Sequence, residues 1–178
     1  MNNSASQGDR RPEFSPCQPS EGQFGTVRHI YISPGHNYRG HHGGPAGEHP
    51  AVELDAVECV AAKGLVGDRY FAEKEDYKGQ ITFFALEVHR QLCAKLGRPG
   101  TPPSVYRRNV ITEGLDLNGL IGKEFELQGI RFLGTEECRP CHWMNQALAP
   151  GAEEAMKGRG GLRAKILTTG TLRRTGTA

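Results

Sequence analysis

Short runs of β-branched and aromatic residues, separated by glycine- and proline-rich turns, constrain the fold of this chain more than any other feature. The runs lie at residues 24–32, 52–62, 79–85, 105–112, 125–127, 130–133 and 162–168. Such residues favour strands, and Gln128-Gly129 predicts a hairpin. Helical spacing occurs at residues 86–96, and residues 152–157 suit a short helix. We predict a mainly β fold with a few short helices, built as a barrel-like, strongly bent mixed sheet.

The N-terminal residues differ in composition from the rest of the chain. Residues 1–23 are polar, with Pro, Ser and Gly throughout, so they cannot bury enough apolar surface to offset the entropy lost on ordering. We predict a disordered tail over residues 1–23, in which Cys17 has no role. Residues 24–178 are expected to form a single domain, since a chain of 178 residues can bury a sizeable core.

Charge and hydropathy argue against several classes of protein. The formal net charge is +2, so there is no electrostatic case for a nucleic-acid binder. No N-terminal stretch has the apolar core of a signal peptide, and no run approaches the roughly 20 apolar residues of a membrane span. The chain has five cysteines, an odd number that favours free thiols. We expect a protein of a reducing, cytoplasmic compartment that binds neither nucleic acid nor membrane.

Two cysteines, Cys138 and Cys141, are the strongest functional signal. They stand in a Cys-Arg-Pro-Cys run just after a predicted strand. A thiolate is a strong nucleophile and a soft metal ligand, and the proline favours an extended or turn backbone. A disulfide between the two is less favoured, because the run lacks the βαβ setting of a redox pair. A zinc site shared with the histidines of residues 36–49 is also less favoured, because their spacing is irregular.

Three further segments carry charged or amide side chains. They are Gly67-Asp68-Arg69, Arg107-Arg108-Asn109 and Arg159-Gly160-Gly161-Leu162-Arg163. In a strand over residues 105–112, alternation would place Arg107 and Asn109 on one face and Arg108 on the other. A guanidinium buried there needs an anionic partner, although each segment alone also suits a solvated turn or edge strand. Gathered in one pocket with the thiols, these groups would suit a phosphate-bearing ligand.

The ordered set of motifs resembles the MOSC domains, a family named for the C-terminal domain of molybdenum-cofactor sulfurases. The motifs are GLVGDRY (64–70), GQIT (79–82), RRNVI (107–111), GLDLNGLIG (114–122), CRPC (138–141) and GGLRA (160–164). The resemblance covers residues 24–170 and implies a β-rich, barrel-like fold with a ligand pocket around one functional cysteine. The chain departs from the family at residues 171–176, which lack the Gly-Asp strand entry that often closes its members.

The resemblance also implies a molybdenum-pterin cofactor (molybdopterin) and a set of site residues. Cys141 matches the cysteine that ligates the metal in relatives that reduce N-hydroxylated compounds, so it is the implied catalytic residue and metal ligand. Arg107 and Asn109 match positions that hold the pterin phosphate and ring, and Arg163 is a weaker match on the last strand. The implied cofactor-binding residues are Asp68, Arg69, Arg107, Asn109 and Arg163.

Two functions remain open on this resemblance. The chain is a molybdenum-pterin oxidoreductase served by an electron-donor protein, or it is a sulfur carrier without redox catalysis of its own. A sulfur carrier would hold a persulfide on Cys141, received from a cysteine desulfurase and passed to the cofactor. In both cases we expect Cys141 to be the reactive thiol and Cys138 to be structural or a resolving partner. We also expect Asp68, Arg107, Asn109 and Cys141 to line one pocket.

Overall fold

Strands supply most of the regular structure, as the short β-branched runs predict. The computed structural model describes residues 25–41 and 44–175, so the tail predicted over residues 1–23, Cys17 included, lies outside the described residues. The strands are β1 (Thr26–Ile32), β2 (Val52–Leu54), β3 (Ala56–Val60), β4 (Gly64–Leu65), β5 (Ile81–Ala85), β6 (Val110–Glu113), β7 (Glu124–Leu127), β8 (Ile130–Glu137), β9 (Leu162–Ile166) and β10 (Gly170–Arg173). The helices are α1 (Leu86–Lys95), the 3-10 helix η1 (Pro103–Tyr106), α2 (Trp143–Ala147) and α3 (Ala152–Met156).

The strands form two sheets. The large sheet has seven strands in the order β2-β1-β6-β5-β9-β8-β7, and the small sheet has three in the order β10-β3-β4. Only β5 and β6 pair in parallel, so the large sheet is mixed. The prediction of a mainly β fold with a few short helices and a mixed sheet is confirmed. Among the described residues neither sheet closes on itself, so the barrel-like arrangement is not confirmed.

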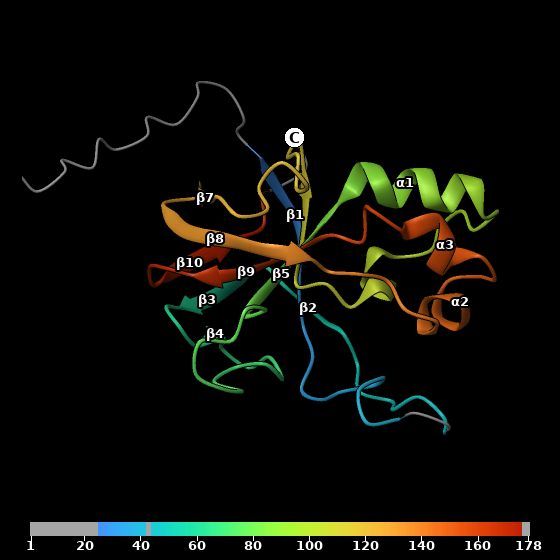
Figure 1. The fold of residues 1–178 in the computed structure, drawn as a ribbon, viewed down its shortest axis with the longest axis horizontal. Coiled ribbons are helices and arrows are strands. Elements are labelled where there is room, and N and C mark those ends of the chain that lie inside the picture. Colours follow the sequence, from blue (N-terminus) through green and yellow to red (C-terminus); the bar gives the residue numbers. More distant parts are fainter. Residues whose placement is uncertain (1–24, 42–43, 176–178) are drawn as a thin grey trace, which may run out of the picture.

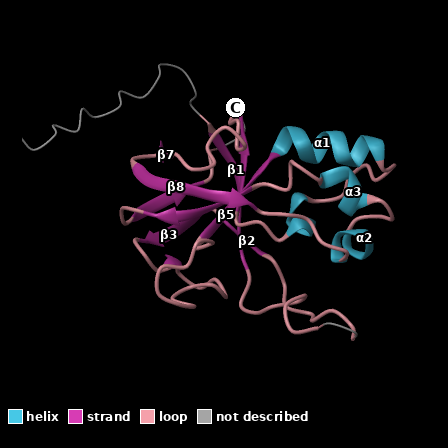
Figure 2. Ribbon diagram, viewed as in Figure 1, coloured by secondary structure: helices cyan, strands magenta, loops and turns pink. Residues whose placement is uncertain are grey.

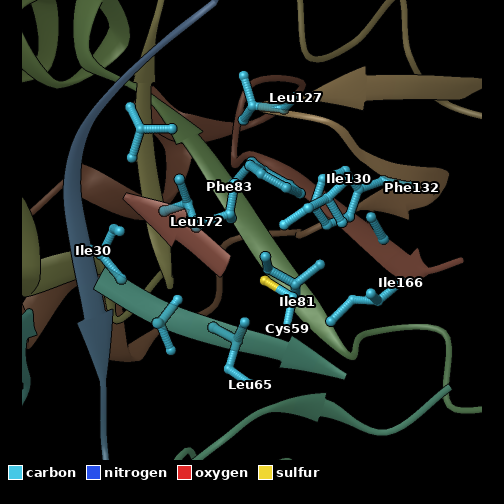
Figure 3. Packing of buried hydrophobic residues seen from close by; sticks show 14 of the residues in the cluster. Ile30, Cys59, Leu65, Ile81, Phe83, Leu127, Ile130, Phe132, Ile166 and Leu172 are labelled. Carbon is cyan, nitrogen blue, oxygen red and sulfur yellow. The ribbon is translucent and has the colours of Figure 1, made fainter. Parts of the chain in front are cut away.

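The large sheet is covered on both faces, and alternation along its central strands explains how. Ile81 and Phe83 of β5 point into one apolar cluster, while Phe84 points into the other. On the first face the cluster includes Leu172 and Cys59 from the small sheet (Figure 3). This two-sided burial accounts for the mostly apolar sequence of β5, in which Thr82 is the one polar residue, because a strand covered on both faces needs no polar side.

The helices cover the second face. The three α-helices gather on one side of the molecule and the sheets on the other (Figure 2). Phe84 and Ile111 pack there with Tyr106 of η1, Trp143 of α2 and Met156 of α3. The helix predicted over residues 86–96 is confirmed as α1, and the one over residues 152–157 as α3. No helix in the described part of the chain is both long and apolar enough to cross a membrane.

The strand predicted over residues 105–112 is wrong in its first half. The chain forms η1 over Pro103–Tyr106, Arg107 has left-handed backbone angles with φ of 53°, and β6 begins only at Val110. Pro103 suits the first turn of a helix, and the Tyr106 ring is fully buried against Phe84, with 4.3 Å between ring centroids. Tertiary packing therefore outweighs the strand preference of residues 105 and 106. Because this segment is not extended, the predicted sharing of a face by Arg107 and Asn109 is also wrong.

Smaller differences follow from chain reversals. The run predicted as one strand over residues 52–62 is two strands in different sheets, β2 and β3, divided at Asp55. Residues 170–173 form β10, which pairs with β3 without the Gly-Asp entry usual in the family. The predicted hairpin is confirmed, since Gln128 and Gly129 both have positive φ, as a two-residue turn of this kind requires.

Candidate functional site

A cleft with a volume of about 110 Å³ lies where the large sheet meets the helical side. Strand β8 ends near the centre of the molecule, and from there the chain runs on to α2 (Figure 1). Both cysteines of the Cys-Arg-Pro-Cys run lie on the wall of this cleft. Among the described lining residues none is Asp or Glu, while six are arginines: Arg39, Arg69, Arg107, Arg108, Arg139 and Arg163. The cleft therefore suits an anionic ligand.

Three of the six arginines have carboxylate partners and three have none among the described residues. Arg69 lies 3.3 Å from Asp68 and Arg163 lies 3.4 Å from Glu136, and Arg39 pairs with Glu73. The other three, which form no ion pair in the described part of the chain, are Arg107, Arg108 and Arg139. Arg107 and Arg108 are half-buried, and a cationic group partly shielded from water without a counter-charge is unfavourable, whereas Arg139 is exposed. These three arginines therefore leave positive charge for a ligand to neutralise.

Arg107 is held by neutral groups of the loop over residues 33–49. Its Nη1 donates to the His49 carbonyl at 2.9 Å, and its Nη2 donates to Ser33 Oγ at 2.6 Å and to the Gly35 carbonyl at 2.8 Å. Burial lowers the pKa of Arg107, and the nearby positive charge of Arg69 lowers it further. Arg107 is thus fixed in place by neutral acceptors, beside a second positive charge and without an ion pair among the described residues, an arrangement that suits an anion.

The pKa of His36, which also lines the cleft, is lowered by burial and by the same positive charges. Burial holds the pKa of His36 below its ordinary value, and the charges of Arg69 and Arg39 lower it further. The His36 ring packs edge-on against Tyr70, with 4.9 Å between centroids. At neutral pH this imidazole is therefore uncharged and adds a planar wall to the cleft.

Arg108 ties the separate walls of the cleft together. Its guanidinium donates to the carbonyls of Gly160 at 3.1 Å, Tyr106 at 2.9 Å and Cys138 at 2.8 Å. Those carbonyls belong to three segments that are far apart in the sequence. Sequence reasoning did not include Arg108 among the site residues, because the assumed strand placed it on the opposite face from Arg107.

Asp68 lies beneath the cleft instead of lining it. Its side chain is buried, and Oδ2 accepts hydrogen bonds from Ser33 N at 3.1 Å and Asn109 Nδ2 at 3.2 Å. Oδ1 accepts from Tyr70 N at 3.1 Å. Asp68 therefore fixes the backbone on either side of the cleft and pairs with Arg69, which does line it.

Asn109 is the second predicted residue that lies beneath the cleft. Its Oδ1 accepts from Thr82 N at 3.1 Å and Thr82 Oγ1 at 2.8 Å, and its Nδ2 donates to the Tyr31 carbonyl and to Asp68. The amide joins β1, β5 and the turn after β4, and all of its groups have partners within the protein. Asn109 therefore has a structural role: its hydrogen bonds connect the segments that lie beneath the cleft.

Replacing Asn109 by Ala is expected to lower the free energy of unfolding by about 2–4 kcal/mol, since buried groups left unpaired cost about 1–3 kcal/mol each. Urea denaturation followed by Trp143 fluorescence measures the change. The control is Asn118→Ala, whose amide is exposed and bonds only the Gly158 carbonyl among the described groups; it should cost less than about 1 kcal/mol. Equal effects of the two substitutions would remove the structural role of Asn109.

Cys138 and Cys141 differ in exposure. Cys138 is 5% exposed, Cys141 is exposed, and both are free thiols, so the disulfide alternative is not realised here. Gly160 permits the close approach of this segment to β9, because a Cβ there would lie 2.5 Å from the Cys138 carbonyl oxygen. The described residues contain no group of three or more His, Cys, Asp or Glu side chains able to hold a metal ion, which leaves the zinc alternative without support.

Aromatic rings complete the cleft and were missed by sequence reasoning. Tyr38 stacks on Trp143 with 5.1 Å between centroids, and Tyr70 stacks on Tyr77 with 5.4 Å. Tyr70 directly follows the Gly-Asp-Arg motif, so its position was a usable signal. Tyr38 lies in a loop of glycine, proline and histidine, where no pattern marks it. Of the predicted site residues, the cleft brings together Arg69, Arg107, Cys141 and Arg163.

Comparison with known proteins supports the fold and identifies the family. The family model of the MOSC domain matches residues 39–176. No curated protein matches the chain. Solved structures of similar fold include the YuaD protein from Bacillus subtilis, with 18% identity, a TM-score of 0.63 and coverage of 84% of this chain and 91% of that one. YiiM from Geobacillus stearothermophilus has 13% identity, a TM-score of 0.60 and coverage of 84% and 71%. The family match spans most of the sequence, and this chain belongs to the MOSC domain family.

Proposed function

We propose that the cleft binds a molybdenum-pterin cofactor and that the protein uses it to reduce N-hydroxylated compounds, with electrons from a donor protein. The observation that carries the proposal is one exposed, free thiol, Cys141, in a cleft lined by six arginines and no described carboxylate. When bound, the cofactor supplies a metal centre for redox chemistry. MOSC membership supports this class of ligand.

The residues present fit such a group in two respects. A single thiol cannot hold a bare metal ion, but it suits a metal already held by an organic ligand, to which it adds one soft donor. The arginines suit the phosphate of the same ligand, because a guanidinium recognises phosphate through paired hydrogen bonds. In addition, Arg163 Nε is buried without a hydrogen-bond partner in the described structure. An acceptor atom of a ligand would satisfy it.

Different side chains would bind different parts of the cofactor. Arg107, already fixed by the loop over residues 33–49, would hold the phosphate end of the cofactor. Cys141 would hold the metal end, and the stacked rings of Tyr70 and Tyr77 offer a planar surface in the same cleft. Asp68 and Asn109 would act from beneath by fixing the backbone that carries these groups.

A sulfur carrier is the second candidate function, and the exposure of Cys141 favours it. An accessible thiol can take a persulfide from a cysteine desulfurase and present it to a cofactor docked on the same arginines. In this case Cys141 carries sulfur and does not ligate metal in the resting protein.

Metal and sulfur analysis separates the two candidates. The protein is purified from a host that makes molybdenum cofactor, and molybdenum, oxidised-pterin fluorescence and labile sulfur are measured on the same sample. Roughly stoichiometric molybdenum and pterin are expected from the first function. Labile sulfur without molybdenum would support the sulfur carrier instead. The absence of molybdenum, pterin and labile sulfur would contradict both functions. Protein from a host unable to make the cofactor is the blank.

A further inference from the structure

The two thiols of the cleft are placed differently enough to have different roles. Cys138 is buried and Cys141 is exposed, yet both side chains line the same small cleft. The proposed function uses Cys141 alone. The sequence left two roles open for Cys138, structural or resolving, and the proposed function does not decide between them.

The backbone between the thiols is anchored at both ends. Cys138 N donates to the Gly161 carbonyl at 2.7 Å, and the Cys138 carbonyl accepts from Arg108 at 2.8 Å. At the other end the Cys141 carbonyl accepts from Met144 N at 2.9 Å. Because the turn is tied down while its thiols face one cleft, little chain entropy opposes a bond between them.

Arg163 gives Cys138 an electrostatic partner that other buried thiols lack. Burial alone would lower the pKa of Arg163, but its interaction with the Cys138 sulfur, together with those with Tyr77 and Glu136, raises that pKa on balance. Burial raises the pKa of Cys59 to about 12 and also raises that of Cys93. Cys59 and Cys93 are therefore poor nucleophiles at neutral pH and do not compete with Cys138 for reaction with Cys141.

We propose that Cys138 is the resolving thiol of Cys141. A peroxide first oxidises Cys141: the O–O bond breaks, one oxygen bonds to the sulfur to give a sulfenic acid, and the other leaves as water or an alcohol. The Cys138 sulfur then attacks the Cys141 sulfur, the S–O bond breaks, and the oxygen leaves as water with the proton of Cys138. Two thiols and one peroxide thus give one disulfide, one water and one water or alcohol.

The disulfide holds Cys141 in a reversible state. Without a neighbouring thiol, further peroxide would convert the sulfenic acid to sulfinic acid, which thiols do not reduce. A small-molecule dithiol restores both thiols by exchange. Reversible oxidation would protect Cys141 as a metal ligand or as a sulfur carrier, and this benefit rests on the proposed function. Formation of the disulfide itself needs no cofactor.

The test uses the 178-residue chain, made without cofactor and treated with hydrogen peroxide, and the remaining thiols are then alkylated. Trypsin does not cleave the Arg139–Pro140 bond, so Cys138 and Cys141 stay in one peptide over residues 132–157. In the wild type this peptide should lose two hydrogens, escape alkylation and recover both thiols with dithiothreitol. In Cys138→Ser and Cys138→Ala it should instead gain the oxygens of sulfinic acid. Cys93→Ser should behave as the wild type.

Equal rates of irreversible oxidation in the wild type and both Cys138 variants would overturn the proposal, as would a disulfide from Cys141 to a different cysteine. Two variants are used so that one misfolded protein does not decide the result, and circular dichroism checks both. The outcome is independent of the cofactor. If the peptide forms the disulfide but the metal analysis finds no molybdenum, this inference stands and the proposed oxidoreductase function is contradicted.

Discussion

Cys141→Ser is expected to lose molybdenum and pterin almost completely when purified from a host that makes the cofactor. Serine replaces a soft sulfur donor by a hard hydroxyl, which is a poor ligand for this metal. Replacing an outer partner of a metal site already costs about 10–100-fold in affinity, so loss of the ligand itself should cost at least about 100-fold. Molybdenum per chain and pterin fluorescence after oxidation measure the effect.

The same experiment has a matched control in Cys93→Ser, because Cys93 lies on α1 outside the cleft. This variant should retain molybdenum at the wild-type level. Since the Cys141 side chain is exposed, the serine variant should unfold at nearly the wild-type temperature. Full loading of Cys141→Ser would show that the ligand position carried over from the family is wrong.

Arg107→Gln is expected to weaken binding of the phosphate end of the cofactor by about 10–100-fold. Hydrogen bonds to charged groups contribute about 1.5–3 kcal/mol, and each 1.4 kcal/mol is about tenfold in affinity. Arg107→Lys keeps the charge but loses the fork that bonds two oxygens at once, so it should fall between the wild type and the glutamine variant. Retention of pterin after gel filtration, as a function of protein dilution, measures the series.

Two controls separate charge from structure in this prediction. Ser33→Ala removes one acceptor of the Arg107 guanidinium and loosens the loop while keeping the charge. Arg173→Gln removes an exposed arginine of β10 that does not line the cleft. Both should bind nearly as well as the wild type. If Ser33→Ala loses as much pterin as Arg107→Gln, then Arg107 acts by holding the loop and not by binding phosphate.

Local patterns predicted the secondary structure wherever each residue's backbone preference and its burial agree. The run over residues 79–85 is β-branched and aromatic and lies in the centre of the large sheet. The hairpin at Gln128-Gly129 follows from residues that tolerate positive φ. The segment over residues 105–112 failed because its local preference and its packing conflict. Tyr106 packs against Phe84, which is too far away in the sequence to be included in a local pattern around Tyr106.

The candidate site divides in the same way. The ordered motifs located Cys141, Arg69, Arg107 and Arg163, which do line one cleft. They did not reveal that Asp68 and Asn109 support the cleft from beneath. That distinction depends on which groups satisfy their hydrogen bonds, and their partners come from distant parts of the chain.

By itself, then, the sequence determined the mainly β content and the family, and it pointed to Cys141, which lies on the wall of the cleft. Only the tertiary structure decided which polar residues line the cleft and which lie beneath it. The physical reason is that strand preference and motif spacing are local properties, whereas the pairing of a buried charge is set by neighbours in space. Arg107 shows this most clearly, because it bonds Ser33, which lies 74 residues away, and still has no described carboxylate partner. The chain thereby leaves a positive charge for a ligand.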